Sequence, residues 1–208
     1  MKPYYEDKYV TIYHGDCREI LPDLPKVDLV LTDPPYPEKY LPLYSVLADI
    51  TVALLKNGGF LYAYCGAQFL PQVIHAFENK LEWYWLFNIK HNGGAPRMWN
   101  KRLMVTSKPV VVFTKGSVNQ EDLRWCAVDH VSELKDKSRH IWGQSEGFPA
   151  KVIIIRTNQD SIVLDPFLGS GTTCFCAKKL LRKSIGIEIE EKYCEIAAKR
   201  CSQMVMEF

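Results

Sequence analysis

Apolar segments alternate with amphipathic segments along almost the whole chain. Near-continuous apolar runs, such as Val27–Thr32 and Phe60–Cys65, are typical of strands that are covered on both faces of a sheet. From Tyr40 onward, apolar residues recur at helical spacing, and the Asn-Gly-Gly sequence at 57–59 predicts the end of that helix. The alternation predicts a doubly wound α/β fold with a mostly parallel sheet.

Seven strands are expected from this pattern, and the one that begins at Pro109 is the candidate for an antiparallel direction at the far side of the sheet. The expected strands are Tyr9–His14, Val27–Thr32, Phe60–Cys65, Glu82–Lys90, Pro109–Gly116, Ser161–Asp165 and Ser184–Ile189. The expected helices are a short one within 16–25 and longer ones within 40–59, 68–80, 172–183 and 190–202.

Two segments, 91–108 and 116–150, interrupt the alternation. Both are polar, contain tryptophan and show weak periodicity. We find no internal repeat and no interdomain linker, and 208 residues suffice for one domain but are few for two. The prediction is a single domain over 1–208, with the two segments as inserted loops that form a candidate target-recognition region.

Composition and charge narrow the picture only slightly. The net charge of +2 does not mark a nucleic-acid binder, so a basic surface would have to be local. No run approaches the roughly 18 apolar residues that span a membrane, and the first residues do not resemble a signal peptide, so we expect a cytosolic protein with no membrane partner. The seven cysteines include no C-x-x-C pair, which favours reduced thiols over a metal site.

The stretch "SIVLDPFLGSGTT", Ser161 to Thr173, reads as a strand, a tight turn and the start of a helix. Its two glycines permit unusual dihedral angles and a close backbone approach. The turn contains only G-x-G, and Asp165 at the strand end would repel a phosphate, so the pattern favours a ligand with a cationic or hydroxyl-rich part over a pyrophosphate. Three hydroxyl side chains can cap the following helix, namely Ser170, Thr172 and Thr173.

Two further acids follow predicted strands. Glu188 ends the next strand, where a carboxylate can accept both hydroxyls of a ribose; the alternative is an ordinary acid at the start of a helix. Asp16 follows the first strand and could accept a hydrogen bond from an adenine amino group; the alternative is a helix N-cap.

The tetrapeptide Asp33-Pro34-Pro35-Tyr36 ends the apolar run that begins at Val27. Pro35 restricts the residue before it to extended conformations, which helps to fix the backbone carbonyl of Pro34. Taken alone, the motif could equally be a rigid Asp-Pro turn that carries a surface tyrosine.

Together, "LVLTDPPY", "VLDPFLGSGTT", "IGIEI" and "HGDC" resemble the S-adenosylmethionine-dependent amino-methyltransferases of DNA, which methylate adenine N6 or cytosine N4. Asp33–Tyr36 matches their acceptor motif and Asp165–Thr173 their cofactor motif. The acceptor motif comes first in the chain, as in the permuted class called beta. The resemblance implies a Rossmann-like methyltransferase fold with a seven-stranded sheet.

The resemblance also implies the site residues. Those for catalysis are Asp33, Pro34, Pro35 and Tyr36; those for S-adenosylmethionine are Asp16, Cys17, Asp33, Asp165, Pro166, Phe167, Gly169, Ser170, Gly171, Thr172, Thr173 and Glu188. The family usually carries an HPxxKP sequence ahead of the cofactor strand. Residues 145–161 lack it, and Phe148 and Thr157 are the candidates for its cofactor contacts.

The chemistry explains why the acceptor motif has this composition. An exocyclic amine is a poor nucleophile because its lone pair is delocalised into the ring. Asp33 and the Pro34 carbonyl would accept hydrogen bonds from the two N–H groups of this amine, and Tyr36 would stack on a base flipped out of the duplex. The methyl group would then move in line to the nitrogen, with positioning and electrostatics supplying most of the effect.

Double-stranded DNA is the expected partner, and residues 91–150 hold nine Lys/Arg against six Asp/Glu. We expect Arg97, Lys101 and Arg102 to bind phosphates; the alternative is a solvated loop with Trp99 tucked into the domain. Because only some 60 residues are available for recognition, a short site, a homodimer or a partner subunit is expected.

Adenine N6 is the preferred acceptor, because cytosine enzymes of this type favour Ser at the first motif position and glutamine-directed relatives favour Asn. The alternatives are cytosine N4, RNA, a protein amide, and a non-catalytic nucleic-acid-binding relic. The relic predicts loss of Asp33, Tyr36 or the glycines of the loop, and all are present. The recognition sequence and the existence of a partner endonuclease stay open.

Overall fold

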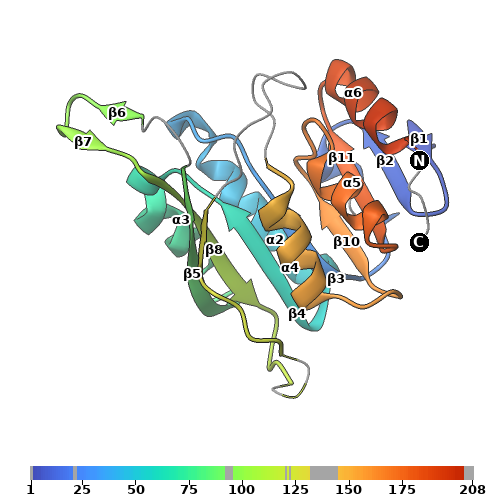
Figure 1. The fold of residues 1–208 in the computed structure, drawn as a ribbon, viewed down its shortest axis with the longest axis horizontal. Helices are drawn as coiled ribbons and strands as arrows, with labels where there is room; N and C mark the ends of the chain where they lie inside the picture. The colour runs from blue at the N-terminus through green and yellow to red at the C-terminus, as the bar shows by residue number, and fades with distance from the viewer. Residues whose placement is uncertain are drawn as a thin grey trace.

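A nine-stranded sheet forms the centre of the computed structural model, which describes residues 2–20, 23–91, 96–119, 121, 123–131 and 145–203 (Figure 1). The strand order is β1-β2-β11-β10-β3-β4-β8-β5-β9. The bounds are β1 Tyr5–Glu6, β2 Val10–His14, β3 Val27–Thr32, β4 Leu55–Tyr64, β5 Glu82–Lys90, β8 Ser107–Thr114, β9 Asp129–Val131, β10 Ile162–Asp165 and β11 Lys183–Glu188.

Five neighbouring strands, β2, β11, β10, β3 and β4, run parallel to one another. Strand β8 runs antiparallel to both β4 and β5, as the sequence suggested. The predicted mostly parallel α/β fold is therefore confirmed. The seven expected strands form the body of the sheet, and the short strands β1 and β9 extend it at its two edges.

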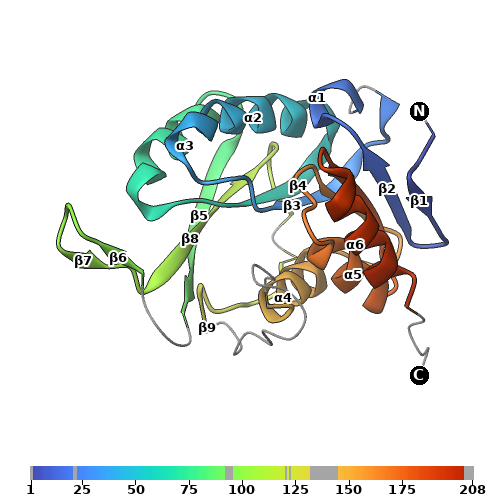
Figure 2. The same cartoon turned by 90° about the horizontal axis from the view of Figure 1, so that it is seen from above.

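Helices cover both faces of the sheet. Figure 2 shows α1 (Cys17–Ile20), α2 (Pro42–Leu54) and α3 (Leu70–Phe77) on one face, and α4 (Gly147–Arg156), α5 (Thr172–Lys179) and α6 (Glu191–Cys201) on the other. Two 3₁₀ turns, η2 (Glu38–Tyr40) and η3 (Ala67–Phe69), lead into α2 and α3. No helix within the described ranges is long and apolar enough to cross a membrane.

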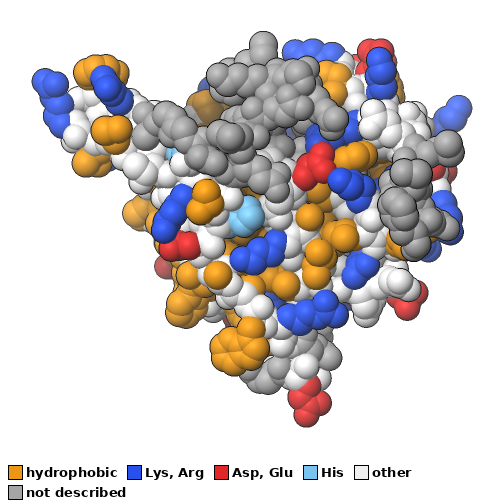
Figure 3. All heavy atoms as spheres, viewed as in Figure 1, with side chains coloured by type: hydrophobic (Ala, Val, Ile, Leu, Met, Phe, Trp, Pro, Cys, Tyr) orange, Lys and Arg blue, Asp and Glu red, His pale blue; other side chains and the backbone are white. Residues whose placement is uncertain are grey.

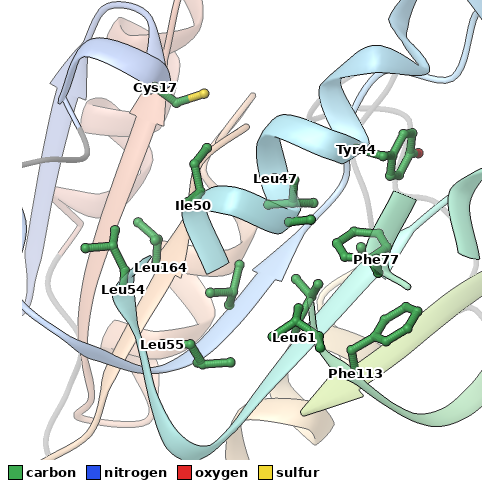
Figure 4. Close-up of a cluster of buried hydrophobic side chains, with 14 of the residues drawn as sticks. Cys17, Tyr44, Leu47, Ile50, Leu54, Leu55, Leu61, Phe77, Phe113 and Leu164 are labelled. Atoms are coloured by element: carbon green, nitrogen blue, oxygen red, sulfur yellow. The ribbon is translucent and has the colours of Figure 1, made fainter. Parts of the chain in front are cut away.

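The largest cluster of buried side chains lies between the sheet and α2 and α3 (Figure 4). Leu47 from α2, Leu61 from β4 and Phe77 from α3 meet there with no exposed surface. Burial of one such side chain contributes about 1.5–3 kcal/mol, so this layer fixes the positions of β3 and β4. A second cluster around Phe148 and Val152 holds α4 and α5 against the other face.

Helix α2 ends earlier than the sequence predicted. Asn57-Gly58-Gly59 was expected to stop it, but the helix ends at Leu54, and Leu55–Tyr64 forms β4. Leu55 is fully buried and pairs with Val27 of β3, so its burial favours the strand over another helical turn. At Gly59 a Cβ atom would lie 2.9 Å from the carbonyl oxygen of Asp28, so this glycine permits close strand packing rather than a helix cap.

The two predicted loops contain more regular structure than their weak periodicity indicated. Within 91–108, β6 (Arg97–Met98) and β7 (Leu103–Met104) form a hairpin that projects from the body of the molecule (Figure 2), and 107–108 already belong to β8. Within 116–150, β9 pairs with β5, and α4 begins at Gly147. Residues 92–95, 120, 122 and 132–144 lie outside the described part of the chain.

Candidate active site

Strands β3 and β10 end side by side at one edge of the sheet. They pair in parallel, with Val163 opposite Leu29 and Leu164 opposite Val30. From β3 the chain continues through α2 on one face, whereas from β10 it continues through α5 on the other face (Figure 2). Such a divergence leaves a crevice beyond the strand ends, and a cleft of about 1150 Å³ opens there.

The cleft collects most residues that the sequence assigned to a site. Ten of them line it: Asp16, Cys17, Asp33, Pro34, Pro35, Tyr36, Pro166, Phe167, Gly169 and Glu188. An adjoining cavity of about 170 Å³ shares Asp33 and is also lined by Asp165, Ser170, Thr172 and Thr173. The two motifs, which are about 130 residues apart in the sequence, thus face a common space.

Asp33 holds two side-chain partners in the cleft. It follows β3 directly, and residues 33–36 continue without forming a turn, unlike the simple Asp-Pro turn that was the alternative. The Tyr36 hydroxyl donates a hydrogen bond to Oδ1 of Asp33, and Nζ of Lys108 lies 2.9 Å from Oδ2. The side chains of this ion pair are only 24% and 22% exposed, so water screens the pair less than it screens a surface pair.

Lys108 reaches Asp33 because β8 is antiparallel to β4. In this pairing Tyr64 at the end of β4 lies opposite Val110, so the start of β8 stands at the carboxyl edge of the parallel strands. The backbone N–H of Cys65 donates to the Pro109 carbonyl at 3.1 Å, which extends the pairing to the residue next to Lys108. In the sequence, Lys108 is one of the nine Lys and Arg residues between 91 and 150, and it was not predicted to lie at the site.

Two tyrosine rings flank the Lys108 ammonium. Its Nζ lies 4.6 Å from the ring centroid of Tyr36 and 4.6 Å from that of Tyr64, within the range of a cation–π contact. Tyr64 is only 4% exposed, and its ring packs edge-on against Phe148 at 5.7 Å. Phe148 lines the cleft as well, so one of the two candidates from segment 145–161 lies at the site.

Asp165 is tied into the fold far more firmly than Asp33. It is 4% exposed, and its Oδ1 accepts hydrogen bonds from the Thr32 hydroxyl at 2.7 Å and the Phe167 N–H at 3.2 Å. Burial raises the pKa of Asp165 to about 6, although the hydrogen bond from Thr32 favours the ionised form. Asp165 thus ties β10 to β3 and presents little surface to a ligand.

The two glycines of the turn serve different purposes. Both have positive φ, 53° at Gly169 and 81° at Gly171. A Cβ atom at Gly169 would meet nothing within 4 Å, which leaves its backbone open to the cleft. At Gly171 a Cβ atom would lie 2.8 Å from Cβ of Ala197, so the missing side chain permits the close approach of α6.

The hydroxyl groups of this turn do not cap α5, contrary to the prediction. The N-cap of α5 is Gly171, and no side chain caps it. The Thr172 hydroxyl instead accepts a hydrogen bond from Arg200 of α6 at 2.9 Å, and Thr173 hydrogen-bonds to the Asp165 carboxyl group. The hydroxyls therefore serve helix packing and the buried acid, because the left-handed glycine already sets the helix entry.

Glu188 and Asp16 both face the cleft, and each also has a local role. Glu188 accepts the Gly169 N–H at 2.8 Å and the Glu190 N–H at 2.9 Å, one on each carboxylate oxygen. Asp16 accepts the Arg18 N–H at 2.9 Å, as an N-cap of α1 would, and also binds the Arg18 side chain. That side-chain hydrogen bond lowers the pKa of Asp16. Each Glu188 oxygen keeps a second lone pair, so a ligand hydroxyl can still bind. Each Asp16 oxygen already accepts two N–H contacts from Arg18, so the exposed Arg18 side chain has to shift before an amine can bind there.

Residues 27–199 match the family model N6_N4_Mtase, described as DNA methylase. The chain belongs to this family. It is therefore an S-adenosylmethionine-dependent amino-methyltransferase of DNA, as the motifs suggested.

Both sequence relatives and solved structures span most of the chain. Type II methyltransferase M.HpaI of Haemophilus parainfluenzae is 28% identical to this chain, and the match covers 84% of this chain and 68% of M.HpaI. Type II methyltransferase M.ScaI of Streptomyces caespitosus is 26% identical, and the match covers 96% of this chain and 83% of M.ScaI. The crystal structure of the M1.HpyAVI–SAM complex is 28% identical with a TM-score of 0.75, and the match covers 93% of this chain and 100% of that structure's chain. The cytosine-N4-specific PvuII DNA methyltransferase shares the fold, with a TM-score of 0.84 at 19% identity. This match covers 99% of this chain and 91% of that structure's chain.

The cleft of this DNA methylase fits S-adenosylmethionine. Gly169 offers open backbone with no Cβ, Glu188 offers a carboxylate beside it, and Phe167 offers an aromatic face. Cys17 lines the same wall, and burial raises the pKa of its thiol to about 11, so it stays uncharged. No phosphate-binding arrangement is needed, which agrees with the acid at the end of β10.

Several predicted residues lie elsewhere. Thr157 is buried at the end of α4, donates its hydroxyl to the Ile153 carbonyl and is not among the cleft residues. Arg97, Lys101 and Arg102 belong to the hairpin, whose base reaches the cleft through Pro96 and Val105. Tyr64 was not predicted as a site residue, although its place at the carboxyl end of an apolar strand was a usable signal.

Proposed function

We propose that this DNA methylase transfers a methyl group to the exocyclic N6 of adenine in double-stranded DNA. The observation that carries the proposal is the position of Asp33, whose carboxylate lies in the cleft directly after β3 and accepts a hydrogen bond from Tyr36. Glu188 and Gly169 line the same cleft. An aspartate at the first motif position is the choice that favours adenine over cytosine.

Asp33 would accept one N–H of the target amine, and the backbone carbonyl of Pro34 would accept the other. Two acceptors on one amine favour a pyramidal nitrogen and free its lone pair for attack. Asp33 need not be a strong base, because the methylated amine is acidic enough to lose its proton. Since Pro34 is buried and Asp33 is partly buried, the contacts form away from bulk water, where they are stronger.

In this proposal, Tyr36 holds the extruded base. A base inside a duplex cannot reach a cleft at the strand ends, so the target nucleotide has to leave the stack. The partly buried Tyr36 offers a ring on which such a base can stack, and stacking of this kind contributes about 1–3 kcal/mol. When bound, S-adenosylmethionine supplies the electrophilic methyl group, and we assign Glu188 to its ribose and Asp16 to its adenine amino group.

The β6–β7 hairpin would bind the DNA backbone. Figure 3 shows Lys and Arg side chains together with hydrophobic ones at the projecting end of the molecule. The guanidinium of Arg97 stacks over Trp99 at 5.5 Å, and Trp99 is 68% exposed, so it is not tucked into the domain. Cations beside an exposed aromatic ring suit a nucleic-acid surface.

Charge reversal tests the hairpin. Arg97→Glu with Lys101→Glu should weaken DNA binding and lower the slope of log K against log salt by about two, roughly one for each lost phosphate contact. Lys26→Glu with Lys183→Glu changes charge equally at the opposite edge of the sheet and should leave the slope unchanged. Equal salt slopes for the two double variants would mean that the hairpin does not bind the DNA backbone.

The reaction itself is tested by transfer of labelled methyl from S-adenosylmethionine to unmethylated DNA, followed by mass spectrometry of the nucleosides. N6-methyladenine is the expected product. N4-methylcytosine would correct the base and keep the mechanism, and one solved neighbour is described as cytosine-N4-specific. No label in DNA with intact cofactor binding would contradict the proposal and favour RNA, a protein amide or a non-catalytic relic.

Other aspects of the proposal follow from the relatives and the chain. The curated relatives named above are Type II methyltransferases, so a partner restriction endonuclease is part of the proposal. A single methyltransferase domain in the cytosol, which acts as a homodimer or with a partner subunit, completes it. Sizing of the protein with and without DNA tests the assembly.

A further inference from the structure

We propose that Lys108 holds the place of the target amine at Asp33 and has to leave it for a base to bind. The inference rests on the proposed function, because it concerns the same acceptor site. It makes Lys108 a residue that determines how readily a base enters, and not one that takes part in the transfer.

The contacts of the Lys108 ammonium match those that the target amine requires. Its Nζ donates to Oδ2 of Asp33 at 2.9 Å, where an amine N–H would donate. It also lies over the Tyr36 ring at 4.6 Å, on a ring that the flipped base would use for stacking. The ammonium and the base therefore compete for one carboxylate and one aromatic ring.

Both carboxylate oxygens of Asp33 are already engaged, Oδ1 by the Tyr36 hydroxyl and Oδ2 by Lys108. A base that stacks on Tyr36 and donates to Asp33 has to replace at least one of these contacts. The Tyr36 hydroxyl belongs to the same short motif as Asp33, whereas Lys108 comes from another strand through a long, flexible side chain. Lys108 is the partner that can withdraw.

Electrostatics during the transfer point the same way. The acceptor nitrogen gains positive charge as it attacks the methyl group, and Asp33 stabilises that charge only while its own charge is not neutralised by another cation. An ammonium left at 2.9 Å from Oδ2 would repel the developing charge. Withdrawal of Lys108 thus removes an opposing charge at the moment when the carboxylate is needed.

The surroundings also favour a reversible contact. The cation–π contacts with Tyr36 and Tyr64 offset part of the desolvation of the ammonium, and its side chain is 22% exposed, so a path to water remains. A single ammonium makes one hydrogen bond to Asp33, whereas a base supplies two N–H bonds and a stacking face. The correct base can therefore displace Lys108, while a small amine gains too little.

The experiment compares Lys108→Met with wild type on a DNA duplex that carries the recognition site mapped with the wild-type enzyme. Methionine keeps the length of the side chain and removes the charge. Because this change removes the ammonium that competes for Asp33, the apparent KM for DNA should fall about twofold to fivefold. The single-turnover rate at saturating DNA should not fall. Lys108→Arg keeps the charge and should keep KM at or above the wild-type value.

A second duplex, with the target base opposite an abasic site, removes the cost of unpairing. The KM difference between wild type and Lys108→Met should persist on it, because the competition lies in the pocket and not in the duplex. Lys56→Met is the matched control: Lys56 pairs with Asp28 at 2.8 Å at the other end of strand β3 and should change neither parameter.

A fall of tenfold or more in the single-turnover rate of Lys108→Met would mean that Lys108 positions Asp33 during the reaction, and it would overturn the inference. So would an unchanged KM together with an unchanged rate. A difference that disappears on the abasic duplex would also overturn it. Wild-type protein that methylates no DNA would overturn the proposed function, and this inference with it, whereas wild-type activity with the wrong Lys108→Met response overturns the inference alone.

Discussion

Asp33 and Asp165 stand at the ends of two neighbouring parallel strands, each before a proline, yet their surroundings differ sharply. Asp165 is almost fully buried and is bound by Thr32, Thr173 and the backbone of Phe167. Asp33 is partly exposed and is bound by the side chains of Tyr36 and Lys108.

The difference separates scaffold from chemistry. Partners that belong to the backbone or to short buried side chains cannot leave without cost, so Asp165 fixes the relative position of β3 and β10. The partners of Asp33 are the side chains of Tyr36 and Lys108, which can move aside, and this agrees with the proposed catalytic role of Asp33. One sequence pattern, an aspartate and a proline after an apolar strand, thus serves two purposes.

The sharpest test of this contrast is Asp33→Ala. Methyl transfer to DNA should fall by about 10²–10³-fold, the size typical for the loss of one preorganised polar group, because the amine loses its charged acceptor. Cofactor affinity, measured by calorimetry, should change much less than the rate, although the resemblance also counts Asp33 among the cofactor contacts. Asp49→Ala, which removes a more exposed partner of Lys80, should keep full activity. Retained turnover in Asp33→Ala would end the catalytic assignment.

Asp165→Asn should change how stability depends on pH. The raised pKa of Asp165, about 6, means that the folded state keeps its proton after the unfolded state has released it near pH 4. Raising the pH from 4 to 6 therefore removes on the order of 2–3 kcal/mol of stability through this group, and the loss is complete above the folded pKa.

Thermal unfolding of wild type and Asp165→Asn across pH 4–7 measures this contribution. The wild-type Tm should fall relative to the variant as the pH rises through this window. Thr32→Val removes a hydrogen bond that favours the ionised carboxyl group, so its Tm should go on falling to a higher pH than that of wild type. Parallel profiles for wild type and Asp165→Asn would contradict the buried-scaffold interpretation.

The smallest expected effect is the difference in folding stability between Ala variants of two glycines in the cofactor turn, Gly169 and Gly171. Ala at either Gly169 or Gly171 adopts a left-handed conformation at a cost of about 1–2 kcal/mol. Gly171→Ala also drives a Cβ atom into Ala197 of α6, which adds about 1–3 kcal/mol. Urea unfolding should therefore show Gly171→Ala as the less stable variant, and equal stabilities would mean that α6 adjusts freely.

Much of the fold could be predicted because local pattern and tertiary structure agree. The apolar runs at 27–32 and 162–165 form strands where the sequence placed them, and the structure pairs these two strands as neighbours. The end of α2 could not be predicted from Asn57-Gly58-Gly59, because the burial of Leu55 against β3 depends on a strand pairing that no local signal carries.

The site shows the same division. Asp33, Tyr36, Gly169 and Glu188 are recognisable because their motifs are short and continuous. Lys108 is not, since its role depends on the register in which the start of β8 lies beside the end of β4, and no local pattern in the sequence carries that register. The exposure of Trp99 was equally hidden, because a two-residue strand leaves almost no periodicity to detect.

The direction of β8 has a mechanical consequence. Because its first residues stand at the cleft, the chain before them leads straight back to the hairpin, and Lys108 follows Met104 by four residues, roughly 14 Å of fully extended chain. If the hairpin binds DNA as proposed, a duplex that immobilises it also restricts where Lys108 can lie. Binding of the hairpin to DNA and withdrawal of Lys108 from Asp33 would then be coupled through this short segment of chain.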